Sequence, residues 1–252
     1  MRTGWFLAAL LVYCTPVAAC TCEIGLVPQC QQLRSFPPAR RLFLGTAESI
    51  RYRSVTVGNT TVPQQLTIFS VEDTFGGSRD KSVEIRSFIK PGMCGFRFHE
   101  GTKYFVDAWN DGGTWSASSC GMTTTANWAS DAIHYLRTLR EHPQGAIIFG
   151  TVKQYVKGST FVSLNNRPIP GTTVVLESMP NAPMQKPKQE AAADGSGWYE
   201  FAGLQAGMYS VTANVPAGFT GVFRHQIDVQ ENGCAQVDVR AHPQRPTPGT
   251  VR

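Results

Sequence analysis

Turn-forming residues interrupt this chain so often that long helices have little room. The 252 residues include 24 Gly and 16 Pro. Only 16% are charged, against roughly 25% in ordinary soluble domains. Hydrophobic residues make up 42% of the chain, which is enough for a folded core. Frequent turns with few charges favour short strands, so we expect a mostly-β fold of one or two domains.

Five strand candidates follow one another in the N-terminal half, each bounded by turn signals. The clearest signal is Asn110-Asp111-Gly112-Gly113, which is typical of a hairpin because these residues tolerate positive φ. The candidates are 41–53, 65–75, 82–89, 103–109 and 114–120. Their imperfect polar–apolar alternation is typical of the curved strands of a small barrel.

One segment, 125–141, has the periodicity of an amphipathic helix. Its apolar stripe consists of Trp128, Ala132, Tyr135, Leu136 and Leu139. His142-Pro143-Gln144-Gly145 ends the helix and predicts a linker between two domains. A shorter stretch, 28–35, could form one or two helical turns before Pro37-Pro38.

The C-terminal half returns to strands separated by Pro, Gly and Asn. The candidates are 146–156, 172–178, 197–201, 207–215 and 226–239. Residues 241–252 hold three prolines and little apolar surface, so we expect a disordered tail there.

Residues 1–19 are typical of a secretory signal peptide. Arg2 precedes an apolar run, and Val17-Ala18-Ala19 forms a small-residue cleavage site. The run is too short to span a bilayer, which takes about 20 apolar residues. Removal of the signal would leave six cysteines: Cys20, Cys22, Cys30, Cys94, Cys120 and Cys234. An even number in an exported chain favours disulfides without fixing their pairing.

The same cleavage site allows a second interpretation. Val17-Ala18-Ala19-Cys20 also fits the box at which bacterial lipoproteins are cleaved and acylated. We therefore expect a secreted protein with Cys20 as its free N-terminus, or alternatively one anchored by lipid on Cys20 at the cell envelope. Only the second interpretation brings the chain to a membrane.

No motif in the chain indicates catalysis. Metalloprotease, nucleophile-elbow and phosphate-loop signatures are absent from the sequence, and its five histidines lack ligand spacing. The net charge of +5 is mild and dispersed, unlike the footprint of a nucleic-acid binder. We expect a non-enzymatic protein with no cofactor, no metal of its own and no nucleic-acid partner.

Residues 20–142 contain a series of motifs in order: Cys20-Thr21-Cys22, Cys30, residues 42–47, 71–77, Cys94-Gly95-Phe96, 101–106, Ser119-Cys120 and the helix ending Leu136-Arg137. In this order and spacing the motifs resemble those of the tissue inhibitors of metalloproteinases and the related netrin-like domains. The resemblance implies a five-stranded OB-fold barrel with a C-terminal helix. It also implies the disulfides Cys20–Cys94 and Cys22–Cys120.

The third disulfide of that family would join the cysteine near Cys30 to one just after the C-terminal helix. This sequence has no cysteine there, and Cys234 in the second half remains. We therefore hypothesise that a Cys30–Cys234 disulfide links the two domains.

The resemblance further implies inhibition of a zinc metalloprotease. In the family, the α-amino nitrogen and carbonyl oxygen of the N-terminal cysteine displace water from the open position of the protease's zinc. Here Cys20 would chelate, Thr21 would enter the specificity pocket, and Met93 beside Cys94 would complete the wedge. Alternatively, Cys20 and Cys22 only fasten the N-terminus to the barrel.

The C-terminal half contains the blocks 148–152, 167–174 and 193–201. In the strongest of them, 193–201, Asp194–Gly197 predicts a tight turn, not a calcium site. On these blocks, residues 146–240 resemble the carboxypeptidase regulatory-like family, also described as Cna-B-type or transthyretin-like. Trp198 and Tyr199 are interpreted as structural residues. The family fold is an Ig-like β-sandwich, and such modules serve as spacers, adhesion units or carbohydrate-binding units.

Together these features predict an exported, non-enzymatic binding protein. The leading hypothesis is inhibition of a metalloprotease through Cys20, Thr21 and Met93. The alternative is a cell-surface adhesion or carbohydrate-binding module with a purely structural N-terminus, whose partner is a surface glycan or protein.

Overall fold

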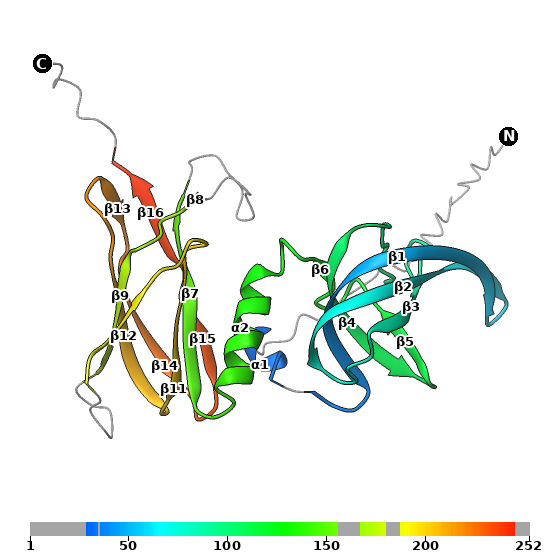
Figure 1. Cartoon of the computed structure of the whole chain (residues 1–252), viewed down its shortest axis with the longest axis horizontal. Coiled ribbons are helices and arrows are strands. Elements are labelled where there is room, and N and C mark those ends of the chain that lie inside the picture. Colours follow the sequence, from blue (N-terminus) through cyan, green and yellow to red (C-terminus); the bar gives the residue numbers. More distant parts are fainter. Residues whose placement is uncertain (1–28, 35, 156–166, 180–186, 245–252) are drawn as a thin grey trace, which may run out of the picture.

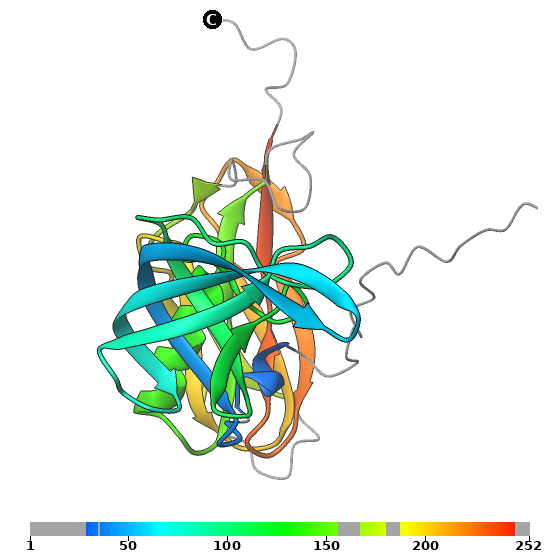
Figure 2. The same ribbon diagram turned by 90° about the vertical axis from the view of Figure 1, so that its right-hand side faces the viewer.

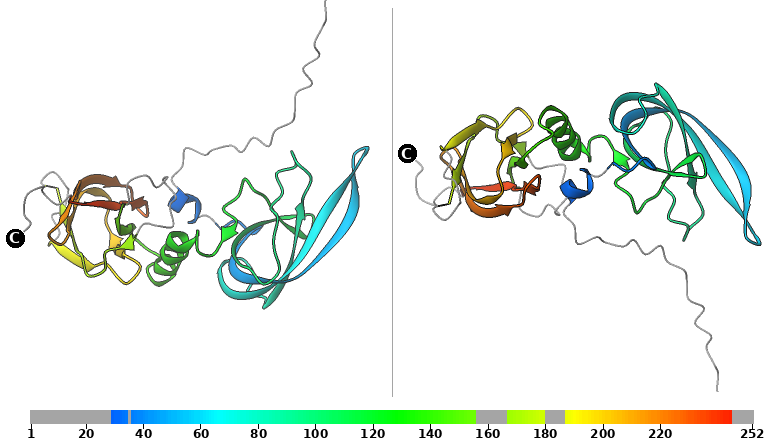
Figure 3. Two further views of the ribbon diagram at one scale, coloured as in Figure 1. Left: turned by 90° about the horizontal axis from the view of Figure 1, so that it is seen from above. Right: turned by 90° about the horizontal axis from the view of Figure 1, so that it is seen from below.

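The computed structural model describes residues 29–34, 36–155, 167–179 and 187–244. Two β units lie along the long axis of the molecule, with helices α1 (Gln29–Gln32) and α2 (Ser130–Glu141) between them (Figure 1). Views from above and below show both helices in the same intermediate layer (Figure 3). Among the described residues, no helix has the length and apolar character needed to cross a membrane.

The N-terminal unit is a closed ring of five strands. They are β1 (Arg40–Val57), β2 (Thr60–Gly76), β3 (Ser82–Phe88), β4 (Lys103–Asp111) and β5 (Thr114–Ala117). Hydrogen bonds join them in the order β1-β2-β3-β5-β4, and a β1–β4 pairing closes the ring. The two-residue β6 (Thr124–Thr125) adds to β4. The mostly-β fold class and the barrel are thus confirmed, whereas membership of the OB-fold family stays a prediction.

Bends in β1 allow the ring to close. Three register shifts interrupt its pairing with β2, and such irregularities bend a strand and increase its twist. As a result, β1 can pair with β2 from Leu42 to Val57 and with β4 through its first seven residues. Figure 2 shows β1 and β2 crossing the front of the barrel.

Aromatic rings fill the barrel. Phe69 makes edge-on contacts with Phe43, Phe98 and Tyr104, at centroid distances of 5.5, 5.0 and 6.2 Å. All four side chains are buried. Edge-to-face packing of this kind adds to the free energy gained from burial alone.

The C-terminal unit is a sandwich of two sheets. One sheet has the order β10-β9-β12-β14, and the other has β11-β7-β16-β13 with β8 and β15 also paired to β7. These strands are β7 (Ala146–Gln154), β8 (Arg167–Pro168), β9 (Thr173–Ser178), β10 (Gln189–Ala192), β11 (Trp198–Leu204), β12 (Gly207–Asn214), β13 (Phe219–Gly221), β14 (Arg224–Val229), β15 (Cys234–Gln236) and β16 (Val239–Pro243). The buried core includes Ile148, Val174, Tyr199 and Val211.

The structure corrects the expected helix 125–141. The helix begins at Ser130, because Thr124 and Thr125 pair with β4 and the next four residues form turns. Trp128 therefore precedes the helix, and its side chain is 48% exposed instead of lying on a buried stripe. Tyr135 and Leu136 are buried as expected.

The expected strand 226–239 and the tail also need correction. Three separate strands, β14, β15 and β16, occupy that region, with a turn at Asn232 that adopts a positive φ of 52°. β16 continues to Pro243 and Ala241 is fully buried, so the sandwich extends past the predicted boundary at residue 240. Residues 245–252 of the predicted tail lie outside the described residues.

Candidate binding site at the joint between the two units

A hydrophobic core joins the barrel to the sandwich. It contains residues from α1, the barrel, α2 and the sandwich: Cys30, Leu33, Leu42, Leu44, Phe105, Ala129, Ile133, Tyr135, Leu136, Ile147, Phe149, Trp198 and Cys234. We call this cluster the joint core. Because one cluster draws on both units, α2 is shared between them and does not simply cap the barrel.

Stacked rings fix α2 against the sandwich. The Tyr135 ring lies 4.8 Å from the Phe149 ring of β7, and Phe149 lies 5.1 Å from Trp198 of β11. His134 of α2 also stacks on Trp198, with ring centroids 5.1 Å apart. The Trp198 indole N–H also donates to Glu200, at 2.9 Å. Trp198 and Tyr199 are buried, so their predicted structural role is confirmed.

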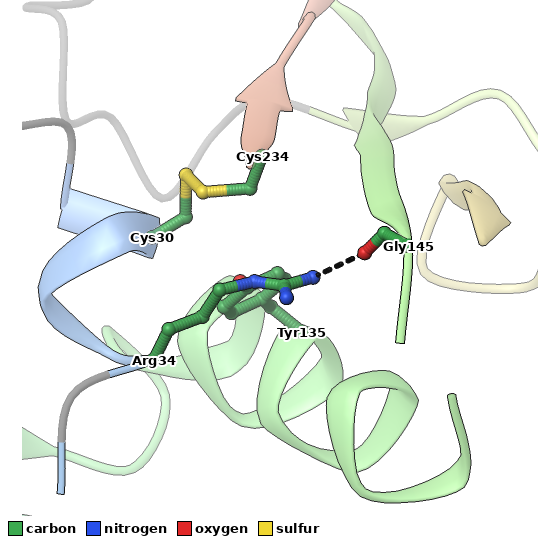
Figure 4. Close-up of a disulfide and its surroundings, with 5 residues drawn as sticks. All are labelled: Cys30, Arg34, Tyr135, Gly145 and Cys234. Atoms are coloured by element: carbon green, nitrogen blue, oxygen red, sulfur yellow. Dashed lines mark hydrogen bonds between the residues drawn. A yellow bond between two sulfur atoms is a disulfide. The ribbon is translucent and has the colours of Figure 1, made fainter. Parts of the chain in front are cut away.

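A disulfide and an arginine fasten α1 across the same joint (Figure 4). Cys30 and Cys234 form the predicted interdomain disulfide, which spans 204 residues of sequence. Arg34 donates from Nε to the Tyr135 hydroxyl and from Nη2 to the Gly145 carbonyl, both at 2.9 Å. Together these contacts link α1 to β15, and the residues directly after α1 to α2 and to the linker.

The arginine of a buried ion pair within the barrel also bonds to α1. Arg40 pairs with Asp107 at 2.9 Å, and both side chains are almost completely buried. Arg40 also donates to the Gln32 carbonyl at 2.6 Å, and Asp107 accepts the backbone N–H of Met122 at 3.2 Å. Buried charges are costly unless such further hydrogen bonds satisfy them, which is the case here.

Two adjoining hollows open along the joint. The first, of about 150 Å³, is lined by Trp128, Asp131 and Gln236 together with apolar joint-core side chains. The second, also of about 150 Å³, is lined by Asp131, Lys153 and Asp238 among others. Asp131 belongs to both, and we call the pair the joint cleft. Ligand pockets occur preferentially at such domain interfaces.

The joint cleft combines an exposed aromatic ring with polar side chains from both units. The Asp131 carboxylate accepts the Ser130 hydroxyl at 3.2 Å and lies 4.0 Å from the Lys153 ammonium. From the sandwich, the Gln236 amide donates to Asp238 at 3.0 Å. A carboxylate, an amide and an ammonium group offer both acceptors and donors to a polyhydroxylated ligand.

Of the residues predicted for protease inhibition, the structure describes only one. Cys20 and Thr21 lie outside the described residues, as does Cys22. Met93 is half-buried in a turn, and its own backbone N–H donates to the Lys90 carbonyl at 3.2 Å. It lines a hollow of about 270 Å³ on the barrel, apart from the joint cleft.

The structure brings Cys94 and Cys120 onto adjacent segments. Both are disulfide-bonded, and their predicted partners lie outside the described residues. The Cys94 carbonyl accepts the Ser119 N–H at 2.7 Å and the Ser118 hydroxyl at 2.8 Å. Cys94 also has a positive φ of 54°, which is uncommon for a residue other than glycine.

The Asp194 turn is built as the sequence predicts. Asp194 accepts the backbone N–H groups of Ser196 at 2.8 Å and Trp198 at 2.9 Å, and Gly197 adopts a φ of 81°. Partial burial raises the pKa of the Asp194 carboxyl, but these bonds and the one from the Ser196 hydroxyl outweigh it, so the pKa is lowered. Among the described residues, no three His, Cys, Asp or Glu side chains cluster to hold a metal.

Sequence reasoning missed the joint cleft. Trp128, Asp131, Lys153 and Gln236 are far apart in sequence and share no motif. The only signal in the sequence was Trp128 itself, and periodicity assigned that residue to the buried stripe of the expected helix 125–141.

Comparison with known proteins identifies no family. No family model matches the chain, and no curated protein matches it. Among solved structures, the minor pilin GBS52 of Streptococcus agalactiae is 11% identical over 86% of this chain and 88% of its own, with a TM-score of 0.32. The resemblance to metalloproteinase inhibitors thus gains no support here.

Two further solved structures match over shorter stretches. The major pilin SpaD of Corynebacterium diphtheriae is 15% identical over 40% of this chain and 32% of its own, with a TM-score of 0.32. This chain therefore spans about a third of the length of that pilin. PA1324 of Pseudomonas aeruginosa, a protein whose proposed role is carbohydrate binding, is 14% identical over 38% of this chain and 88% of its own, with a TM-score of 0.28. TM-scores this low do not support any inference about the function of this chain.

Proposed function

We propose that this protein is an exported, non-enzymatic binding protein whose joint cleft holds a surface glycan. The Cys30–Cys234 disulfide supports export, because structural disulfides persist in oxidising compartments outside the cytosol. The secreted form and the lipid-anchored form at the cell envelope both satisfy this requirement.

The exposure of Trp128 carries the proposal. A tryptophan that leaves 48% of its surface exposed beside a cleft offers an apolar face for the C–H groups of a sugar ring. Asp131 and Gln236 line the same hollow and can bond to the hydroxyl groups of the ring. Because the disulfide and the joint core hold the two sides of the cleft in place, little ordering entropy is lost on binding.

A glycan array followed by calorimetric titration of the strongest hit tests the proposal. Trp128→Ala should weaken binding by about tenfold or more, since aromatic contacts of this kind dominate binding energy. Trp109→Ala is the matched control: Trp109 is 46% exposed but lines neither hollow of the cleft, so affinity should not change. Absence of binding across the array, or equal losses in both variants, would refute the proposal.

Metalloprotease inhibition remains a second candidate function. One observation favours it: Cys94 and Cys120, the predicted anchors of the N-terminal segment, are both disulfide-bonded on adjacent segments, and Met93 adjoins them. An inhibition assay with zinc proteases tests this function, with an extra residue before Cys20 as control. Inhibition that survives the extension would exclude chelation through the Cys20 amine.

A further inference from the structure

A third hollow lies on a different part of the molecule. It has a volume of about 380 Å³ and is lined by the end of β2, by α2 and by the segment that follows α1. It shares no lining residue with the joint cleft. We call it the arginine groove, because Arg34, Arg79 and Arg140 line it.

The floor of the arginine groove is apolar. Phe36, Phe75, Leu136 and Leu139 contribute to the lining, and Phe36 is 36% exposed. Gly76 allows Phe36 to lie close to the backbone: a Cβ at residue 76 would be 2.2 Å from the Phe36 ring. The Phe75 ring packs against the Phe105 ring, with centroids 6.1 Å apart. The fold therefore presents an aromatic and aliphatic surface here.

The charges around this floor are mostly positive. Arg34 bonds to the neutral oxygens of Tyr135 and Gly145. Arg79 is exposed and forms no ion pair with any described residue. A cleft with one sign of charge and low-dielectric walls attracts ions of the opposite sign.

Two carboxylates near the groove, Asp73 and Asp80, are already engaged. Asp73 lies 2.9 Å from Arg140 and 3.5 Å from Arg137, so one carboxylate serves two guanidinium groups. Asp80, next to Arg79 in sequence, pairs with the buried Arg41 at 3.2 Å. The rim of the groove therefore keeps a net positive charge.

We propose that the arginine groove binds a small amphipathic anion, a carboxylate carried on an alkyl or aryl body. Guanidinium groups match carboxylates with two parallel hydrogen bonds, and the apolar floor would cover the hydrocarbon. A neutral lipid would make no ion pair with the arginines, and an inorganic anion would not cover the apolar side chains of the floor. The volume lies within the range of about 300–1,000 Å³ found for small-ligand pockets.

Fluorescence titration of the intact protein with 11-(dansylamino)undecanoate tests this proposal. We expect saturable enhancement that a carboxylate competitor, laurate or 2-naphthoate, reverses, and that dodecanol, the uncharged analogue of laurate, does not. Competition with 2-naphthoate distinguishes the sources: displacement by laurate alone indicates an alkyl body, and displacement by 2-naphthoate alone indicates an aryl one. No saturable binding, displacement by neither carboxylate, or displacement by dodecanol as effective as by the better carboxylate, would overturn the proposal.

Paired charge variants locate the site. Arg79→Gln/Arg140→Gln should weaken probe binding by about tenfold or more, as expected for loss of charge-assisted hydrogen bonds. Arg51→Gln/Arg224→Gln removes the same charge from residues that do not line the groove, and should bind the probe normally. Equal affinity in the two variants would contradict the assignment. Trp128→Ala should not affect the probe, so this site and the proposed glycan site can fail independently.

Discussion

Gly150 lies where β7 passes so close to the residues after β15 that no side chain has room. A Cβ there would be 2.0 Å from the Val237 carbonyl oxygen, and backbone cannot move aside as a flexible side chain could. Gly195 is the opposite case, because a Cβ there would meet nothing within 4 Å. The two glycines lie in the same unit but impose different limits on sequence.

We predict that Gly150→Ala lowers the free energy of unfolding by about 3 kcal/mol, the upper range for overpacking in a folded core. Gly195→Ala should change it by less than about 0.5 kcal/mol, as for ordinary surface substitutions. Urea unfolding of both variants checks the pair. Equal effects would mean that the close approach at Gly150 does not exist.

Asp194 makes part of the stability dependent on pH. Its pKa is lowered in the folded protein, so its contribution is present above the ordinary carboxyl pKa and is lost as the pH falls through the lowered value. Asp194→Asn should therefore reduce the decline in unfolding free energy below about pH 4. At neutral pH we expect a cost below about 1 kcal/mol, because the side chain is exposed and the amide oxygen can still accept hydrogen bonds.

Denaturant titrations of Asp194→Asn and wild type between pH 2 and pH 7 provide the measurement. Glu72, whose pKa is lowered chiefly by its hydrogen bond from Lys103, leaves a residual acid dependence in both proteins. Identical acid profiles for the two would show that the turn does not hold the carboxylate in its charged form.

At the scale of elements, α2 decides how the two units are joined. Its periodicity identified it from the sequence, and Tyr135 and Leu136 are buried as that pattern requires. Periodicity could not show that the helix contacts two units, because one apolar stripe looks the same whichever partner covers it. The exposure of Trp128 was hidden for a related reason: the helix start depends on the pairing of Thr124 and Thr125 with β4.

We predict that Phe149→Ala costs about 3–5 kcal/mol, the range for large-to-small changes at buried aromatic residues. Phe149 is buried and stacks between Tyr135 of α2 and Trp198 of β11, so the change removes the contact that joins them. Phe149→Leu, which keeps most of the volume, should cost less than half as much. A thermal or urea unfolding series measures both, and a cost below about 1 kcal/mol for Phe149→Ala would contradict the proposed packing.

The strands show what sequence patterns can and cannot provide. Long strands such as β1 and β4 were predicted because turn signals bound their apolar residues. The short strands β8, β10 and β13 have two to four residues, too few for alternation to appear, and their neighbours in the sheets define them. Such short strands therefore cannot be predicted from their own residues, because only their pairing in the assembled sheet defines them.

At the scale of the whole molecule, the barrel and the sandwich share one core. The sequence predicted two domains with a linker at 142–145, and the chain does pass from α2 to β7 there. The joint core was not predictable, because its members come from both sides of that linker and no local pattern relates them. The disulfide was foreseen only because a resemblance left Cys30 without its usual partner.

Removal of that disulfide tests how strongly the joint depends on it. Cys30→Ala/Cys234→Ala should lower the free energy of unfolding by about 3–5 kcal/mol, since the closed loop spans 204 residues and long loops restrict the unfolded chain most. Equilibrium unfolding under non-reducing conditions measures the loss. Arg34 and the stacked rings remain in this variant, so we expect it to fold. A change below about 1 kcal/mol would show that the bond does not restrain the unfolded chain.

Differential scanning calorimetry of the intact, oxidised protein tests the shared core most directly. If the joint core makes the barrel and the sandwich one cooperative body, unfolding will show a single transition whose calorimetric and van't Hoff enthalpies agree. Two resolved transitions, one for the barrel and one for the sandwich, would show instead that the units are independent domains in contact, and the joint would then not provide a fixed cleft.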